Sequence, residues 1–414
     1  MRVCHHTGAL AVFSPIIVRP ETNYRLIMGF PTMKNYGNFA AEIKSITHTT
    51  QIMTHHMSKQ NALIATILTL FAASGTHLVH AQDSTKTIVP ILNYTADLVV
   101  NTHGGIKTGT VYQGYAEAGV KINPWKNGQF NFTIASTHGG EPTGTLVGDW
   151  QEMDNIEASN HIFALNAWYS HTIGKVTVMA GLQDANDSYS TCDASDYLQN
   201  TAFGGNVVFM SGGNVPTMPT NGLGLNAMWH VSDAFSWQTG IFDGGVIGLD
   251  DGNRFNLKHK LSSSKGYLIV SEAQLKPTGA WMLKAGTYYH TGLENYGYYA
   301  SCEKSFRLQG EQAVNTFLTG GYSPHATDAA TVGITGGCSL TSLFSKSGAD
   351  ALTAGFASAH LDGHRWETAI ELNYRYQLGG HFYVSPDMQW ILNPAGDPEA
   401  KNALVATLRL GFEL

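Results

Sequence analysis

The amino-acid sequence predicts an all-β protein, a transmembrane antiparallel up-and-down β-barrel. Apolar and polar residues alternate in many short segments of residues 82–414, and turn-forming residues separate these segments. No uninterrupted apolar run in this part of the chain approaches the roughly 20 residues that a transmembrane helix needs. Strands that cross a membrane must close on themselves, because lipid offers no partner to backbone N–H and C=O groups.

A secretory signal precedes the predicted barrel, although it begins only at residue 57. Residues 57–81 carry one cation, then the uncharged run 62–73, and end on Val-His-Ala. This order is typical of a cleaved signal peptide. We therefore predict a translation start at Met57, cleavage after Ala81, and a mis-assigned or disordered leader over residues 1–56. A membrane anchor over 62–73 is the alternative, but its twelve residues are fewer than the roughly 20 required.

The clearest alternation lies near the C-terminus, in residues 367–378 and 403–414. In both segments one face is largely apolar, and all the charged residues lie on the opposite face. Only a strand, whose side chains point alternately to opposite faces, sorts residues in this way. The polar faces of the two segments include Glu371, Asn373, Arg375 and Arg409.

About fifteen segments of 8–12 residues show this kind of pattern, and no amphipathic helix is predicted between them. A soluble sandwich or propeller is the alternative for so many strands. In those folds the face away from the core is rich in charge. Here one face is apolar, with Tyr and Trp towards the strand ends, and the other holds isolated charges among Gly, Asn, Thr and Gln. An apolar outside and a polar inside favour the membrane barrel, and no blade-length repeat supports a propeller.

The charge balance argues against a nucleic-acid partner. Residues 1–81 hold six of the 24 basic and two of the 31 acidic residues, so residues 82–414 keep 18 and 29, a formal net charge of −11. They contain no basic stripe. The S-x-x-K match at Ser262–Lys265 lacks the S-D-N and K-T-G partners of a hydrolase. We predict no catalytic residue and no cofactor.

Metal and cysteine signals are weak. Clustered oxygens at 184–187 and 250–253 are compatible with calcium, but both lack EF-hand spacing and resemble ordinary turns, so we predict no metal site. Residues 82–414 contain three cysteines, of which one pair could close in an oxidising periplasm, and their spacing does not say which. They are Cys192, Cys302 and Cys338.

Several stretches together resemble a known family. They are "GDWQEMDNIEAS" (148–159), "LNAWYSHTIGKVTVMAGLQDANDSY" (165–189), "GAWMLKAGTYYHTG" (279–292) and the closing passage from Glu367, with "PDMQ" and "NPAG" in order. From about Tyr94 to Leu414 the chain resembles the carbohydrate-selective porins of the OprB type. The resemblance implies sixteen strands in an outer-membrane barrel that lets sugars, glucose above all, diffuse into the periplasm. Asn166 departs from the Glu that family members often carry, and the chain ends in Leu414 rather than the frequent Phe.

Strand parity selects the candidates for a sugar pathway. Residues on the polar parity of the strands are expected to line the pore, where charged groups and aromatic faces would meet hydroxyls and sugar rings. For any of them the alternative is a structural role in the barrel interior, or for the tryptophan a place in the interfacial belt. These pore-lining candidates are Trp168, Lys284, Tyr288, Glu371, Asn373, Arg375 and Arg409.

The acidic segment 149–157 lies between two predicted strands. We expect it to fold into the lumen and narrow it, and the alternative is a solvated surface loop. Its candidate constriction residues are Asp149, Gln151, Asp154, Asn155 and Glu157.

The sequence thus predicts a passive sugar porin of the bacterial outer membrane, exported through a cleaved signal peptide. The expected partners are sugars such as glucose, outer-membrane lipid and the barrel-assembly machinery, with the barrel a monomer or a homotrimer. Three alternatives stay open: a porin for other solutes, an outer-membrane barrel enzyme, and a soluble periplasmic β-protein.

Overall fold

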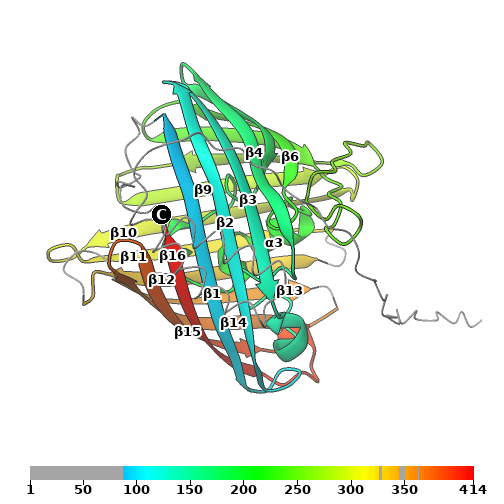
Figure 1. Ribbon diagram of the computed structural model, residues 1–414, viewed down its shortest axis with the longest axis vertical. Helices are drawn as coiled ribbons and strands as arrows, with labels where there is room; N and C mark the ends of the chain where they lie inside the picture. Colours follow the sequence, from blue (N-terminus) through cyan, green and yellow to red (C-terminus); the bar gives the residue numbers. More distant parts are fainter. Residues whose placement is uncertain (1–86, 326–328, 345–349, 362) are drawn as a thin grey trace, which may run out of the picture. The chain divides into compact units, whose positions relative to one another are not determined.

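The computed structural model describes residues 87–325, 329–344, 350–361 and 363–414, so the predicted leader and signal peptide lie outside the described residues. The described chain forms sixteen strands that close into a barrel (Figure 1). The strands are β1 (Ile88–His103), β2 (Gly109–Trp125), β3 (Gly128–Gly139), β4 (Ile162–Ile173), β5 (Val176–Gln183), β6 (Gly222–His230), β7 (Phe235–Asp243), β8 (Tyr267–Leu275), β9 (Trp281–His290), β10 (Asn295–Arg307), β11 (Ala313–Tyr322), β12 (Ala330–Thr341), β13 (Asp350–Leu361), β14 (Trp366–Leu378), β15 (Phe382–Leu392) and β16 (Ala403–Glu413).

Each strand pairs antiparallel with its neighbours in sequence, and β1 closes the barrel against β16. The closing register sets Asp97 opposite Arg409, and the N–H of Leu414 donates to the carbonyl of Leu92 over 3.1 Å. Closure gives both edges of every strand a partner, as a lipid environment requires. This confirms the predicted all-β up-and-down barrel and its sixteen strands.

The two faces of the barrel wall differ as the alternation predicted. On β14, Ile370 and Leu372 are each more than two-fifths exposed on the outside, whereas Glu371 and Asn373 are 1% and 0% exposed on the inside. Large apolar side chains cover the outside of the other strands in the same way. An apolar outer surface of this kind suits contact with lipid.

The connections at the two ends of the barrel differ in length. At one end short turns join the strands, such as 126–127, 174–175 and 379–381. At the other end the connections include three long segments, 140–161, 184–221 and 244–266. In outer-membrane barrels the long loops face the cell exterior and the short turns face the periplasm.

Two of the long segments fold into the barrel. We call residues 140–161 the first infolded segment and residues 184–221 the second infolded segment. The first contains the helical turn η2 (Thr143–Val147), and the second contains η3 (Asp193–Ser195), η4 (Thr201–Phe203) and the short helix α3 (Val207–Gly212). A further turn, η5 (Pro394–Gly396), lies between β15 and β16. No helix of the described residues is long and apolar enough to span a membrane.

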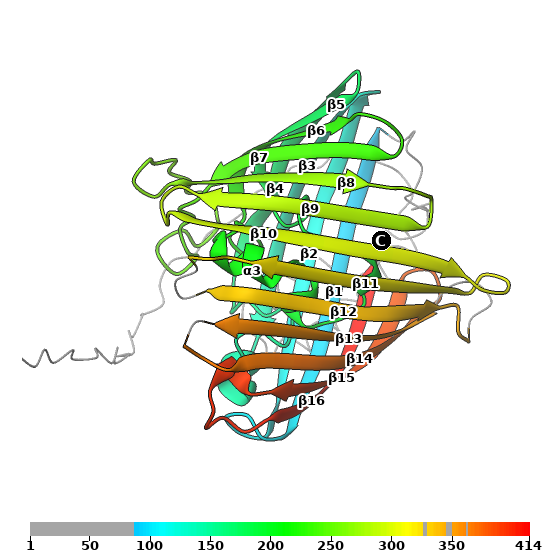
Figure 2. The same cartoon turned by 180° about the vertical axis from the view of Figure 1, so that it is seen from behind.

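The second infolded segment provides the barrel with an interior apolar core. Its helix α3 packs against β10, β11 and β12, and Figure 2 shows it among these strands. Val208 and Phe209 of α3 are fully buried with Leu268 of β8 and Tyr288 of β9. Asn206 caps the helix, since its side chain accepts from the N–H groups of the second and third residues that follow it.

The three cysteines of the described residues are all free. Cys192 is buried in the second infolded segment, while Cys302 and Cys338 lie on β10 and β12. The disulfide that the sequence left open is therefore not formed in this structure.

Candidate functional site

A carboxylate on the inner face of β14 holds the first infolded segment. Glu367 accepts hydrogen bonds from the backbone N–H groups of Trp150 at 2.7 Å and Gln151 at 2.8 Å. The side chain of Gln389 on β15 adds a bond to the carbonyl of Met153 at 2.7 Å. Hydrogen bonds to a charged acceptor are stronger than those between neutral groups. The segment that the sequence offered as a constriction thus docks on the inner wall.

A second carboxylate, four residues further along β14, holds the second infolded segment in the same way. Glu371 accepts from the backbone N–H groups of Gln199 and of Asn200, the latter at 3.0 Å. The side-chain amide of Asn200 also donates to Gln389 at 3.2 Å. Period-2 geometry puts Glu367 and Glu371 on one face, so a single strand anchors both infolded segments.

Arg409 of β16 connects the wall to the first infolded segment. Its Nε and Nη2 donate to the carboxylate of Asp97 over 2.7–3.0 Å, and Nη2 also reaches Asp154 at 3.0 Å and Asn155 at 2.9 Å. Asp97 and Asp154 are 0% and 1% exposed. Removal of this guanidinium would leave two buried carboxyl groups without a cation, which is costly in a buried site.

A cavity of about 390 Å³ opens between the two infolded segments and the wall of β1, β2, β4 and β16. We call it the polar cavity. It contains hydrogen-bond donors, carboxylates and one phenol ring. Oδ1 of Asn166 is buried and has no hydrogen-bond partner within the described part of the chain. The polar side chains that matter for its chemistry are Tyr115, Glu117, Asn155, Asn166, Asp187 and Arg409.

The carboxyls of the second infolded segment give the polar cavity a charge that varies with pH. Burial raises the pKa of Asp187 to about 7, with further increases from the charges of Asp184 and Glu117. Burial likewise raises the pKa of Asp184, against hydrogen bonds from Met218, Thr217 and Asn186 that lower it.

The first infolded segment contains further buried carboxyls. Burial, and then the nearby charge of Glu367, raise the pKa of Asp149 well above its usual value. Burial raises the pKa of Glu157 to about 7, although the backbone N–H of Thr143 donates to it at 3.0 Å. Because burial raises these pKa values, docking of the first infolded segment on the wall is more favourable when its carboxyls are protonated.

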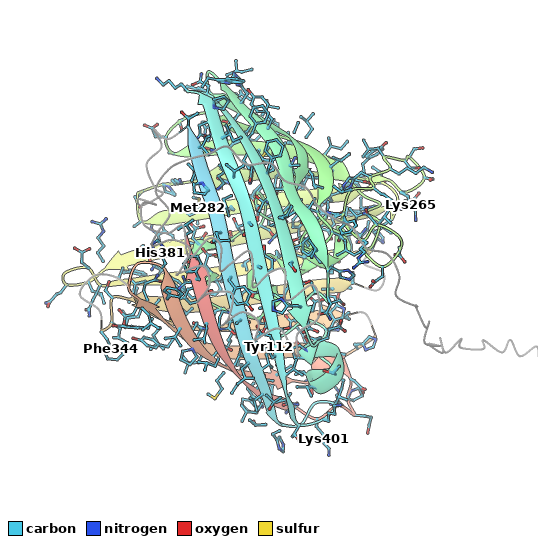
Figure 3. The ribbon with its side chains drawn as sticks, viewed as in Figure 1. Tyr112, Lys265, Met282, Phe344, His381 and Lys401 are labelled. Carbon is cyan, nitrogen blue, oxygen red and sulfur yellow. The ribbon has the colours of Figure 1, made fainter. Side chains whose placement is uncertain are left out.

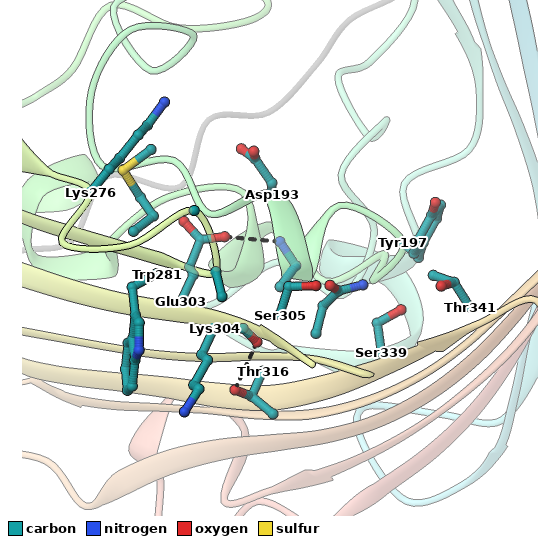
Figure 4. A pocket seen from close by; sticks show the side chains of 15 residues that line it. Asp193, Tyr197, Lys276, Trp281, Glu303, Lys304, Ser305, Thr316, Ser339 and Thr341 are labelled. Carbon is teal, nitrogen blue, oxygen red and sulfur yellow. Dashed lines mark hydrogen bonds between the residues drawn. The ribbon is translucent and has the colours of Figure 1, made fainter. Parts of the chain in front are cut away.

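A second cavity of about 410 Å³ lies on the other side of the second infolded segment, beside the turn 276–280. We call it the turn-side cavity. Figure 4 shows Asp193 and Tyr197 of the infolded segment and Glu303 of β10 among the residues that line it. Glu303 accepts from the N–H of Ala194 at 3.2 Å. The lumen therefore has a polar space on each side of this segment.

The pore-lining candidates all lie on the inward parity of their strands, but only Arg409 lines the polar cavity. Trp168 is half-buried opposite Asn131 of β3. Lys284 donates to the carbonyl of Thr191 at 2.8 Å, and Tyr288 donates to that of Val208 at 3.0 Å. Both side chains thus contact the second infolded segment.

The other candidates on β14 bond within the wall. Asn373 donates to Asp387 at 3.0 Å and accepts from Ser385 at 2.9 Å. The guanidinium of Arg375 lies 3.6 Å from the ring centre of Tyr383 and pairs with Glu413 at 2.8 Å.

The loop candidates divide similarly. Asn155 lines the polar cavity, whereas Gln151 and Asp154 serve the docking bonds described above. Neither carboxylate oxygen of Asp149 has a hydrogen-bond partner within the described chain.

Sequence reasoning missed most residues of the polar cavity. Tyr115 and Glu117 alternate with Ala116 and Ala118 in the predicted strand 110–122, so the sequence does indicate that both side chains point into the barrel. The sequence does not indicate that they lie near Asp187, because that depends on how the second infolded segment crosses the lumen. In the sequence Asp184 and Asp187 give only a weak calcium signal, and the described residues contain no group of three or more ligands suited to a metal ion.

Comparison with known proteins identifies the family. The family model described as carbohydrate-selective porin, OprB family, matches residues 121–293 and 289–414. The chain belongs to this family. Porins are channels rather than enzymes, and a barrel porin implies an outer membrane and, in this family, sugar substrates.

Solved structures resemble the porin in fold. A high-pH structure of Pseudomonas putida OprB is 20% identical, covers 79% of this chain and 94% of that one, and gives a TM-score of 0.72. A low-pH structure of the same protein is 15% identical, covers 79% and 93%, and gives 0.54. No curated protein matches the porin.

The pKa of Asp187 predicts a pH-dependent ion preference. Since this pKa is raised to about 7, the carboxyl is neutral below that pH and negative above it. We expect the preference of the pore for cations to rise between about pH 6 and 8. Reversal potentials in a KCl gradient would measure this, and Asp187→Asn should flatten the profile. A profile of unchanged slope in the variant would contradict the assignment.

Proposed function

We propose that the polar cavity is the sugar-selecting constriction of this porin, through which neutral sugars such as glucose diffuse passively into the periplasm. The observation that supports this most is the composition of one cavity. Arg409, Glu117, Asp187 and Asn166 offer charged and amide groups in about 390 Å³, and Tyr115 adds an aromatic ring.

These groups suit a sugar better than an ion. A hexose entering a narrow pore exchanges bonds to water for bonds to the protein, and each hydroxyl needs both a donor and an acceptor. The guanidinium supplies donors and the carboxylates supply acceptors. The face of Tyr115 can cover the apolar face of a pyranose ring. Because charges of both signs are present, a strong preference for one ion is not expected at neutral pH.

A porin for small solutes in general is the second candidate, and the presence of a second polar cavity, the turn-side cavity, favours it. The two candidates differ in what Tyr115 does. In a sugar pore its ring contributes binding energy, whereas in a general pore it only occupies volume.

Replacing Tyr115 by alanine is expected to slow glucose uptake into proteoliposomes about two- to tenfold, the value of one aromatic contact. Uptake of small amino acids should stay the same or rise, because the pore is wider. Tyr112→Ala is the matched control, since Tyr112 lies on the same strand with its side chain on the outer face and 47% exposed. Equal changes for glucose and amino acids in Tyr115→Ala would favour the general porin.

We infer further that export uses the signal at residues 57–81, with cleavage after Ala81, and that the barrel-assembly machinery inserts the chain. The barrel then works in the outer membrane as a monomer or a homotrimer. The signal-like order of residues 57–81 and the closed barrel support this.

A further inference from the structure

The third long segment, 244–266, contains the densest basic stretch of an otherwise acidic chain. Four of the 18 basic residues of 82–414 fall within 254–265, and no Asp or Glu occurs between residues 252 and 271. All four cationic side chains are exposed. We call residues 254–265 the basic loop, and its cations are Arg254, Lys258, Lys260 and Lys265.

The basic loop also exposes large apolar side chains. Phe255, Leu257 and Leu261 are 53%, 70% and 55% exposed. Large apolar side chains exposed among cations, close together in the sequence, are typical of a segment that contacts another surface. Amphiphilic membrane surfaces, with an anionic headgroup layer above an apolar layer, match this combination.

Hydrogen bonds to β4 and to the second infolded segment anchor the first half of the basic loop. The N–H of Ala164, near the start of β4, donates to the carbonyl of Phe255 at 3.0 Å. The buried amide of Asn256 donates to the carbonyls of Ala164 at 3.2 Å and Asn221 at 3.0 Å. Oδ1 of Asn253, also buried, accepts from the N–H of Lys258 at 2.7 Å. The two asparagines are buried, whereas the cations and the large apolar side chains of the loop are exposed. The ammonium of Lys258 also donates to the carbonyl of Gly252.

The basic loop lies at the level on the barrel where the lipid headgroups are expected. Lys265 comes two residues before Tyr267, the first residue of β8, which shares the outer face with Ile269. Ile269 pairs with Tyr289 of β9, which is also exposed on the outside. Tyrosines at strand ends mark the interface of the membrane. Two residues span at most about 7 Å, so the backbone of Lys265 lies close to this belt. Figure 3 shows it on the outer edge of a projecting loop.

We propose that the basic loop binds the phosphate groups of the glycolipid in the outer leaflet, with Phe255, Leu257 and Leu261 against its acyl chains. The long loops of such a barrel face the leaflet in which lipopolysaccharide carries these phosphates. Arg254 can bind a phosphate through two parallel N–H groups, and the lysines act as point charges.

The test compares binding of fluorescent diphosphoryl lipid A, and of its dephosphorylated form, to the purified porin in detergent. We expect the combined variant R254A/K258A/K260A/K265A to bind the diphosphoryl form at least about tenfold more weakly than wild type, and the dephosphorylated form to bind wild type poorly. The matched control is K107A/R365A/K401A, which removes three exposed cations from other loops at the same end and should bind normally.

Glucose block of the single-channel current checks that each variant is folded, and it is a property independent of lipid. The charge reversal Lys260→Glu, at an exposed position, gives a second and milder variant that should also weaken binding. Equal binding of diphosphoryl lipid A to wild type and the combined variant would overturn the proposal. So would an equal loss in the control, or binding that does not depend on the phosphates.

Discussion

Replacing Arg409 by alanine is expected to destabilise the porin by about 3–5 kcal/mol, because Asp97 and Asp154 then remain buried without a cation. The first infolded segment should lose its tie to β16, since the bonds to Asp154 and Asn155 disappear with the guanidinium. The unfolding free energy in urea with lipid vesicles measures the first effect. Conductance should rise, and glucose should bind about tenfold more weakly for the loss of one charged donor.

Arg375→Ala is the comparison for this variant. Arg375 is a second arginine on the inner face, but it pairs with one carboxylate, Glu413, whose side chain is about half exposed. Its removal leaves no buried charge unpaired, so we expect a loss of stability well below that of Arg409→Ala. Equal losses in the two variants would show that the buried arrangement around Arg409 has no special role.

Replacing Glu371 by alanine is expected to release the second infolded segment from the wall. The buried N–H groups of Gln199 and Asn200 would lose their acceptor, at a cost of about 1–3 kcal/mol each. Faster hydrogen exchange over residues 193–206 and larger current fluctuations in single channels would report the release. Glu371→Gln should be milder, because the amide oxygen still accepts a hydrogen bond.

Glu367→Ala is the matched control, since it removes a carboxylate from the same face of the same strand. Glu367 holds Trp150 and Gln151 of the first infolded segment. Its loss should therefore speed exchange around residue 150 and leave residues 193–206 protected. If either variant loosened both segments equally, the separate roles of the two carboxylates would be wrong.

The barrel was predictable because membrane strands sort their residues locally. On β14 a period of two, read from twelve residues, suffices to put Glu371 and Asn373 inside and Ile370 and Leu372 outside. The inward parity of Tyr288 and Lys284 was correct for the same reason. Closure of β1 on β16 then follows from the need to pair every edge strand.

The interior was not predictable, because it depends on contacts between residues far apart in sequence. Val207, Val208 and Phe209 are consecutive, so they show no alternation, and a helix as short as α3 leaves no periodic signal. The docking of α3 against the barrel wall also requires glycine at the contact, where no side chain would fit. A Cβ at Gly333 would lie 2.2 Å from a methyl carbon of Val207. Glycine is abundant in the sequence, but the sequence does not indicate which glycine contacts which side chain, because these contacts join residues far apart in the chain.

The same limit applies to the candidate site. Arg409 and Asn155 were chosen by strand parity and by the acidic loop, and both line the polar cavity. Glu371 was chosen by parity too, yet its oxygens bond to the backbone of the second infolded segment. Strand parity predicts that a side chain points into the barrel. Whether that side chain contacts solvent or protein depends on the path of the infolded segments.

The most direct test of the proposed constriction is the single-channel conductance of the porin, purified from outer membranes, in a planar bilayer titrated with glucose. We expect discrete current steps that fall saturably as glucose is added, and a smaller fall in Tyr115→Ala than in Tyr112→Ala. Steps that stay the same at every glucose concentration would contradict the account, because a solute that binds in the polar cavity must obstruct the ions that pass through it.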